Sequence, residues 1–371
     1  MTEEPDQIPI ADVELSDDEI AAAVDVLESG QLVQGEQVSQ FESSFADAVG
    51  ADHAIAVSSG TAALHVAYLA TVPEGASVLV PALSHIATAS MVSFANATPL
   101  FCDVDSETYT LDLDSAHRRI TDDTAAIAPV HLFGNVCDID TIQSFADEHD
   151  LTVIWDAAQA LGSTYDGHDV GSFDDIVSYS FYPTKNMTTT EGGMLTTDDQ
   201  NLAAVCRKLR AHWQTEKYYH PDLGLNYRMT DVEGAIGRKQ LEKLDSSVAA
   251  RQDNARYLTD RLRPVDGVKP PSVQSTATHS YHQYTISIDL AVLDCTRAQF
   301  RESLADCGVD TAVHYPRALH EQPAFDTTVT LPTAERLCDR VCSLPVYPSL
   351  TTTELDRIAS AVRATAADYR V

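Results

Sequence analysis

Short apolar runs of strand type alternate with stretches of helical length through most of the first 200 residues. The apolar runs are AIAV at 54–57, SVLVP at 77–81, PLFCDV at 99–104, AAIAPVHLF at 125–133 and TVIWD at 152–156. Stretches of helical length lie between several of them, at 60–71, 84–95 and 139–149. Apolar strands that alternate with helices are typical of a parallel sheet covered on both faces. The pattern therefore predicts an α/β fold with a mainly parallel central sheet.

An N-terminal helix is predicted to start at the capping box Ser16-x-x-Glu19 and to stop at Gly30. It would present three apolar side chains on one face: Ile20, Val24 and Leu27.

The character of the sequence changes after about residue 245. The segment HQYTISIDL at 282–290 alternates in the manner of a strand with one exposed face. We therefore expect two domains. A large one would span residues 1–245, N-terminal helix included, and a smaller C-terminal α+β domain would span 246–371.

The charge of the chain is strongly unbalanced. It carries 24 Lys and Arg against 56 Asp and Glu, a formal net charge of −32. Nucleic acids and anionic membranes attract basic surfaces, so both are excluded as partners. Self-repulsion of this size strains a compact fold in ordinary salt and is screened at molar salt. We hypothesise a halophilic protein from a salt-rich cytoplasm; an acidic but salt-indifferent enzyme is the alternative.

Cysteine usage and the N-terminal sequence indicate the compartment. The seven cysteines form no Cys-x-x-Cys pair, which argues against a disulfide framework and against a zinc site. The N-terminal sequence MTEEPDQ is acidic where a signal peptide is basic and then apolar. No apolar run approaches the ~18 residues that span a bilayer. We expect a cytoplasmic protein without a metal site.

One lysine stands out by its position. Lys185 follows a predicted strand at 176–181 and precedes a turn at Gly192 and Gly193. The carboxyl end of a strand is where open α/β sheets bind ligands. A lysine amine there can form a Schiff base if desolvation or positive charge lowers its pKa. Taken alone, a solvated surface lysine is the simpler interpretation.

A second motif suits a phosphate. In SSGTAAL at 58–64, Ser59, Gly60 and Thr61 would form the first turn of a buried helix. Free backbone N–H groups and the helix dipole hold phosphates at such a turn, and glycine allows close approach. Any N-capped helix could share this pattern. Ser180 is positioned to supply another hydroxyl to the phosphate.

A carboxylate ends another predicted strand. Asp156 closes TVIWD, and burying it is costly unless a cation or a donor meets it. A protonated pyridine nitrogen is such a partner, and Gln159 could hydrogen-bond a ring substituent. A helix N-cap is the alternative for Asp156. His85 could lie flat on an aromatic ring, although a lone histidine is more often a core residue.

Ten stretches in the same order resemble the DegT/DnrJ/StrS family of pyridoxal-phosphate-dependent sugar aminotransferases, and the likeness runs nearly end to end. The stretches are GQLVQGEQVSQFESSFADAVG, SSGTAAL, PALSHIATA, FCDVD, HLFGNVCDID, WDAAQALGSTYDG, SFYPTKNMTTTEGG, GLNYRMTDVEGAIGRKQLEKLD, HYPRALHEQPAF and SLPVYPSLT. The resemblance implies the fold type I of these transferases and pyridoxal 5'-phosphate as the cofactor.

The resemblance also implies a role for each site residue. Lys185 matches the lysine that binds the cofactor covalently and shuttles protons. Asp156 matches the partner of the pyridine nitrogen, and Gln159 the residue beside the ring hydroxyl. Matches to residues that contact the phosphate or the ring are Ser59, Gly60, Thr61, Ser180 and His85. Asn226 matches a residue that reaches the phosphate in the other subunit of a homodimer. Residues that would border the substrate are Tyr182, Lys217, Tyr315 and His320.

The implied reaction transfers an amino group, from L-glutamate, to a keto-sugar nucleotide for amino-sugar and surface-glycan biosynthesis. Amination of a keto-inositol or another cyclic ketone is one alternative. Dehydration of a deoxysugar occurs in this family where histidine replaces the lysine, and Lys185 counts against it. A catalytically silent regulatory homologue is the non-enzymatic alternative.

Overall fold

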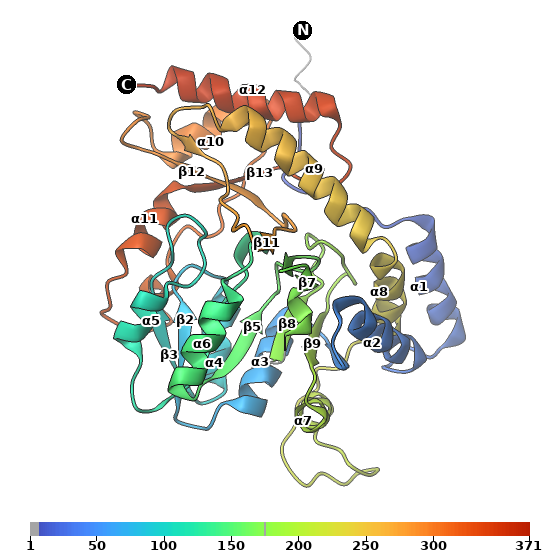
Figure 1. Cartoon of the computed structure of the whole chain (residues 1–371). Coiled ribbons are helices and arrows are strands. Elements are labelled where there is room, and N and C mark those ends of the chain that lie inside the picture. Colours follow the sequence, from blue (N-terminus) through green and yellow to red (C-terminus); the bar gives the residue numbers. More distant parts are fainter. Residues whose placement is uncertain (1–6, 174–175) are drawn as a thin grey trace.

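The computed structural model describes residues 7–173 and 176–371, and the acidic residues 1–6 lie outside this range. Its largest sheet has seven strands in the order β1-β9-β8-β5-β4-β2-β3 (Figure 1). In chain order the strands are β1 (His53–Val57), β2 (Ser77–Pro81), β3 (Thr98–Cys102), β4 (Thr124–Ile127), β5 (Thr152–Asp156), β8 (Ile176–Ser180) and β9 (Gly193–Thr197). From β3 to β8 all neighbours are parallel, whereas β9 runs antiparallel to β8 and β1. The predicted α/β fold with a mainly parallel sheet is confirmed.

Helices cover both faces of this sheet because its strands are apolar on both sides. In β2, Val78 and Val80 join one hydrophobic core and Leu79 joins the other. The first core includes residues of α3 (Gly60–Thr71), α4 (Ile86–Phe94) and α7 (Gln200–Arg210). The second includes residues of α2 (Glu36–Val49), α5 (Leu113–Arg119) and α6 (Ile139–His149). The sheet is thus the middle layer of three.

A third core lies beside this unit. It surrounds an antiparallel sheet of β10 (Val268–Lys269), β12 (Tyr284–Ile288) and β13 (Val341–Leu344). Its helices are α9 (Leu244–Leu262), α10 (Arg297–Asp306) and α12 (Thr352–Asp368). Ile8 belongs to the same core, and its N–H donates to the Gly308 carbonyl at 2.9 Å. The predicted boundary at 245/246 falls inside α9, and the division into two domains stays a prediction.

The remaining elements connect these layers. A small sheet is formed by β6 (Thr164–Tyr165), β7 (His168–Asp169) and β11 (Ala277–Thr278). Two further helices are α8 (Asp231–Leu241) and α11 (Pro332–Arg340), and short 3-10 turns lie at Leu132–Gly134, Val170–Ser172 and Leu319–Glu321. None of the helices in the described ranges combines the length and the hydropathy needed to cross a bilayer.

Two predicted strands differ from the structure. The run at 125–133 stays a strand only to Ile127, because Pro129 has no N–H for the ladder and Phe133 adopts a positive φ of 64°. The alternating segment at 282–290 lacks the expected exposed face. Tyr284, Ile286 and Ile288 belong to the third core, and Thr285 on the other face is buried as well.

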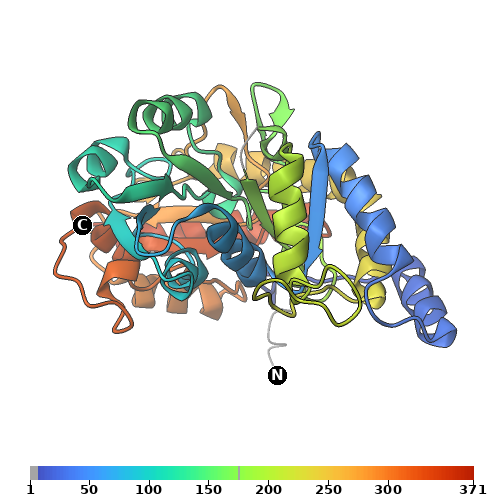
Figure 2. The ribbon, with the colours of Figure 1, turned by 90° about the horizontal axis from the view of Figure 1, so that it is seen from below.

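Helix α1 (Asp17–Ser29) forms with the predicted capping box and with Gly30 as its left-handed C-cap. Its apolar stripe faces away from the chain. Ile20, Val24 and Leu27 are 51%, 43% and 57% exposed, while Glu19 is fully buried. The helix packs on α8 at the edge of the molecule (Figure 2). The single chain thus leaves an apolar strip uncovered on α1.

Candidate active site

A cavity of about 510 Å³ lies at the carboxyl ends of β5 and β8. Ten of the residues predicted for the site line it: Ser59, Gly60, Thr61, His85, Asp156, Gln159, Ser180, Tyr182, Lys185 and Tyr315. They come from segments far apart in the chain. The parallel strands bring them together because such strands end at one edge of the sheet.

The first turn of α3 forms one end of the cavity. Ser59 is the N-cap, and its Oγ accepts a hydrogen bond from the Ala62 N–H at 3.1 Å. A Cβ on Gly60 would lie 2.6 Å from the Cβ of Ser180, so only glycine lets α3 approach β8 this closely. A Cβ on Gly193 would likewise meet the Ser59 carbonyl oxygen at 2.4 Å. The first N–H groups of a helix have no partner within it, and this turn can bind an anion such as a phosphate.

Asp156 ends β5 with its carboxylate buried. Oδ2 accepts from the Thr88 hydroxyl at 2.8 Å, and Oδ1 accepts from the Ala158 N–H at 3.1 Å. Burial raises the pKa of Asp156, whereas these two hydrogen bonds and the charge of Lys185 oppose the rise. Within the described chain no cation lies within ion-pair distance of this carboxylate, so the site has room for a positively charged ligand atom.

Lys185 lies in the loop between β8 and β9. Its N–H donates to the Tyr182 carbonyl at 2.9 Å, and the Asn186 amide donates to the Leu161 carbonyl at 3.1 Å. The residue as a whole is partly exposed, and it lines the cavity. Desolvation lowers the pKa of Lys185 to about 8, and the charge of Asp156 limits the fall. A larger fraction of this amine is therefore neutral, and nucleophilic, than of an ordinary lysine.

Three aromatic or amide side chains border the cavity. The Gln159 side-chain oxygen accepts from the Phe133 N–H at 2.7 Å, and its amide nitrogen donates to the Tyr315 hydroxyl at 3.1 Å. These bonds fix the orientation of the amide. The rings of His85 and Tyr315 meet edge to face, with centroids 6.1 Å apart. His85 is also the N-cap of α4, where its Nδ1 accepts from the Ala87 N–H at 3.2 Å.

The cavity also contains residues that were left out of the sequence-based site. His282 and His314 line it, and the Nδ1 atom of each is buried with no hydrogen-bond partner in the described chain. Burial lowers the pKa of His314 to about 4 and lowers that of His282 well below its usual range. Both imidazoles are therefore neutral near neutral pH. Glu191 lines the cavity as well. The distance along the chain from Lys185 does not identify any of these three residues as part of the site. His314 stands in the motif HYPRALHEQPAF, next to Tyr315.

Three predicted site residues lie outside this cavity. His320 is buried, its Nε2 lies 3.1 Å from Glu335 Oε1, and its ring packs near Phe101. Lys217 and Asn226 are exposed in the segment that follows α7. In Figure 1 this segment projects from the body of the molecule.

Comparisons with known proteins place the chain among aminotransferases. The model of the DegT/DnrJ/EryC1/StrS aminotransferase family matches residues 13–363. GDP-perosamine synthase of Caulobacter vibrioides is 39% identical over 333 residues, which are 88% of this chain and 90% of that protein. The spore coat polysaccharide biosynthesis protein SpsC of Bacillus subtilis is 35% identical over 93% of this chain and 94% of its own. The crystal structure of DesV from S. venezuelae superposes with a TM-score of 0.93 at 33% identity, covering 97% of this chain and 99% of that one.

The contact between Gly60 and Ser180 can be tested by substitution. We expect Gly60→Ala to lower the free energy of unfolding by about 1–3 kcal/mol, because overpacking a close contact costs this much. Adding Ser180→Gly removes the Cβ that the new methyl group would meet. Urea unfolding should therefore show that Ser180→Gly lowers the free energy of unfolding less in the Gly60→Ala background than in the unmodified protein. Equal costs in the two backgrounds, within about 0.5 kcal/mol, would mean that the residues do not meet.

The pKa of Lys185 predicts its reactivity. In the cofactor-free full-length protein, acylation of Lys185 followed by mass spectrometry across a pH series should have a midpoint near pH 8, since only the neutral amine reacts. Exposed lysines should show a midpoint near about 10.4. Asp156→Asn removes a negative charge that favours the protonated amine, so the Lys185 midpoint should then fall below that of the unmodified protein. A Lys185 midpoint equal to that of exposed lysines would contradict the desolvated environment.

Proposed function

This chain belongs to the DegT/DnrJ/EryC1/StrS aminotransferase family, and on that premise we propose that it transfers an amino group from L-glutamate to a keto-sugar nucleotide. It is a pyridoxal-phosphate-dependent aminotransferase of fold type I, as its sequence predicted. The product would be an amino sugar for a surface glycan. The relatives support this substrate class by their names, which are those of a GDP-perosamine synthase and of a protein of spore coat polysaccharide biosynthesis.

The observation that carries the amino-transfer part of the proposal is the set of polar groups in the cavity, which fits pyridoxal phosphate. The Asp156 carboxylate is buried with two hydrogen-bond donors and, among the described residues, without a cation at ion-pair distance; a protonated pyridine nitrogen would be its cationic partner. The turn at Gly60, with Ser180 beside it, would hold the phosphate. Lys185 would bind the aldehyde carbon. When bound, the cofactor supplies the electron sink that stabilises a carbanion at the carbon losing its proton.

The chain's own residues would orient the substrates and move the protons. With a pKa of about 8, the Lys185 amine could accept a proton from the donor's α-carbon near neutral pH and pass it to a cofactor carbon, and it would move a proton in the reverse direction for the second substrate. The oriented Gln159 amide would border the ring hydroxyl, and His85 would stack on the ring. Tyr182 and Tyr315 would border the sugar. Lysine, rather than histidine, at position 185 favours amino transfer over the dehydration known in this family.

We further propose a homodimer with shared sites. Asn226 and Lys217 are exposed and lie outside the cavity of their own chain, so they would serve a site only across a subunit contact. Two apolar side chains in the same segment, Tyr218 and Leu223, are 84% and 89% exposed. The apolar strip of α1 is also uncovered. Burial of these apolar surfaces against a second copy would be favourable.

Lys185→Ala should abolish amino transfer and leave the fold intact. The substitution removes both the group that binds the cofactor and the one that moves the proton, a loss of at least ~10³-fold. The measurement is formation of 2-oxoglutarate from L-glutamate by the loaded enzyme, with circular dichroism as a check on folding. Lys208→Ala, a lysine outside the cavity, is the control. An unmodified protein that produces no 2-oxoglutarate would favour the catalytically silent homologue or a different amino donor.

The shared site predicts complementation between two inactive variants. In a mixed dimer of Lys185→Ala and Asn226→Ala chains, one site would carry both substitutions and the other would be intact. Mixing the two proteins under conditions of subunit exchange should therefore restore activity that neither has alone. Native mass spectrometry would show that exchange has occurred. If mixed dimers form without regaining activity, Asn226 acts within its own chain or has no part in the site.

A further inference from the structure

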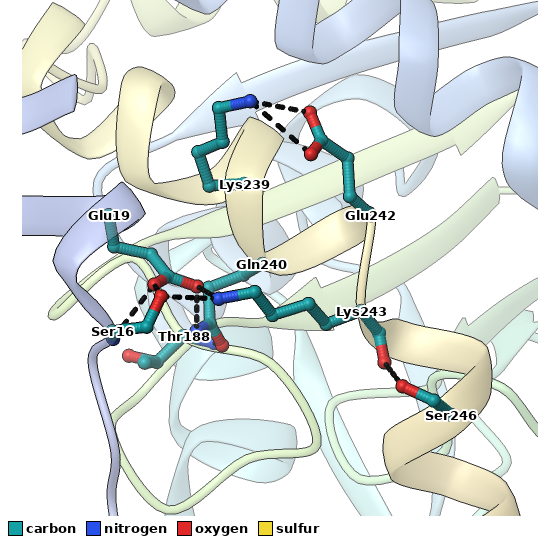
Figure 3. A network of polar contacts seen from close by, with 8 residues as sticks. All are labelled: Ser16, Glu19, Thr188, Lys239, Gln240, Glu242, Lys243 and Ser246. Carbon is teal, nitrogen blue, oxygen red and sulfur yellow. Dashed lines mark hydrogen bonds and ion pairs between the residues drawn. The ribbon is translucent and has the colours of Figure 1, made fainter. Parts of the chain in front are cut away.

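The carboxylate of Glu19 is buried on the inner side of α1, in a network with α8 and the start of α9 (Figure 3). Its Oε1 accepts from Lys243 Nζ at 2.7 Å and from Gln240 Nε2 at 2.9 Å. Its Oε2 accepts from the Ser16 N–H at 2.8 Å and from the Ser16 hydroxyl. Burial alone would raise the pKa of Glu19, but the hydrogen bonds from Lys243, Ser16 and Gln240 lower it to about 2. The group is therefore ionised and accepts hydrogen bonds only.

This network continues to the loop of Lys185. The Gln240 side-chain oxygen accepts from the Thr188 N–H at 3.3 Å (Figure 3). Thr188 lies three residues after Lys185, and its hydroxyl donates to the Phe181 carbonyl at 2.9 Å. A hydrogen bond thus joins the two ends of the segment from Phe181 to Thr188, and the Thr188 N–H links this segment to α8.

The charge of Glu19 sets the direction of the Gln240 amide. An ionised carboxylate has no proton to donate, so the amide must present its NH₂ group to Glu19. Its oxygen is then turned toward Thr188. Without the carboxylate, either end of the amide could face the Thr188 N–H, and only one end could accept its hydrogen bond.

Met187 packs this loop into the second core, but another side of the loop borders open space. A second cavity of about 250 Å³ lies between the loop and the helices, and Lys185, Asn186, Thr188, Gln240 and Lys243 are among its lining residues. A loop that borders a void has room to shift into it. On the other side, the Asn186 amide holds the loop through the Leu161 and Ser280 carbonyls. The bond from Gln240 restrains the side that faces this void.

We propose that Gln240 and Glu19 are positioning residues for Lys185: the Glu19 carboxylate orients the Gln240 amide, which holds the Lys185 loop through Thr188. This inference rests on the proposed role of Lys185. Neither residue lines the larger cavity that Lys185 shares with Asp156. Helix α1, at the edge of the molecule, would thereby help to position the active-site lysine.

The sharpest test is Gln240→Leu, which removes the link to Thr188 and leaves the Glu19–Lys243 ion pair in place. Glu242→Gln on the same region of the surface is the matched control. It breaks the exposed pair with Lys239, which is 2.9 Å long, and touches no atom of the loop. In the loaded enzyme, hydrogen exchange of peptides spanning 181–190 should become about tenfold faster in Gln240→Leu and stay unchanged in Glu242→Gln.

A second readout separates positioning from general destabilisation. A freed loop lets the Lys185 amine reach water, so the pH midpoint of its acylation in the cofactor-free protein should rise by at least about half a unit from about 8 toward the value of exposed lysines. Loss of stability alone would lower the melting temperature without moving this midpoint. Glu19→Gln should move the midpoint in the same direction if it folds.

The outcomes distinguish this inference from the proposed function. If Gln240→Leu matches Glu242→Gln in both exchange and midpoint, the positioning role is wrong. If borohydride still traps pyridoxal phosphate on the Lys185→Ala chain, the assignment of Lys185 is wrong whatever Gln240 does. Trapping at Lys185 in the unmodified protein, together with altered exchange and midpoint in Gln240→Leu, would support both.

Discussion

The parallel pairing of β5 with β8 is the constraint on which the site depends. Asp156 is in register with Ser178, and the Ala157 N–H donates to the Ser178 carbonyl at 2.9 Å. Because parallel strands end at the same edge, the carboxylate that closes β5 and the loop that follows β8 meet there. The first turn of α3 joins them because Gly60 has no Cβ to keep it from Ser180. A carboxylate, an amine and a set of free N–H groups are thus assembled by backbone geometry.

Burial acts in opposite directions on the two charged groups of the cavity. It raises the pKa of Asp156 and lowers that of Lys185, so desolvation favours the neutral form of each, while their attraction favours the charged forms. The carboxylate is left without a cation at ion-pair distance, and the amine is left more easily deprotonated. Both features suit an enzyme whose cofactor brings a positive nitrogen to Asp156 and an aldehyde to Lys185.

Helix α1 differs from an ordinary surface helix because it exposes an apolar strip and buries a carboxylate. Three of its large apolar side chains, Ile20, Val24 and Leu27, are exposed, and its buried residues are Val26 and the carboxylate Glu19. A buried carboxylate needs donors, and the donors that meet Glu19 come from α8 and the start of α9. The same helix therefore offers an apolar strip to a second chain and a polar anchor to the helix that contacts the Lys185 loop. The proposed dimer surface and the proposed positioning network lie on opposite sides of one element.

The sequence alone was sufficient for the alternation of strands and helices in the first 200 residues, for the family, and for the residues of the cavity that belong to local motifs, such as Lys185 and Asp156. The spacing of apolar residues, the helix caps and the glycines in turns are short-range signals, because a few neighbouring residues are enough to form each of them. Tertiary structure alone decided that β12 is buried on both sides and that the apolar stripe of α1 is exposed. It also decided that His314 reaches the cavity and that Gln240 bonds Thr188. These outcomes depend on which surfaces lie opposite one another across dozens to hundreds of residues. No local pattern encodes that, because a buried polar contact needs only a partner in space, at any separation in the chain.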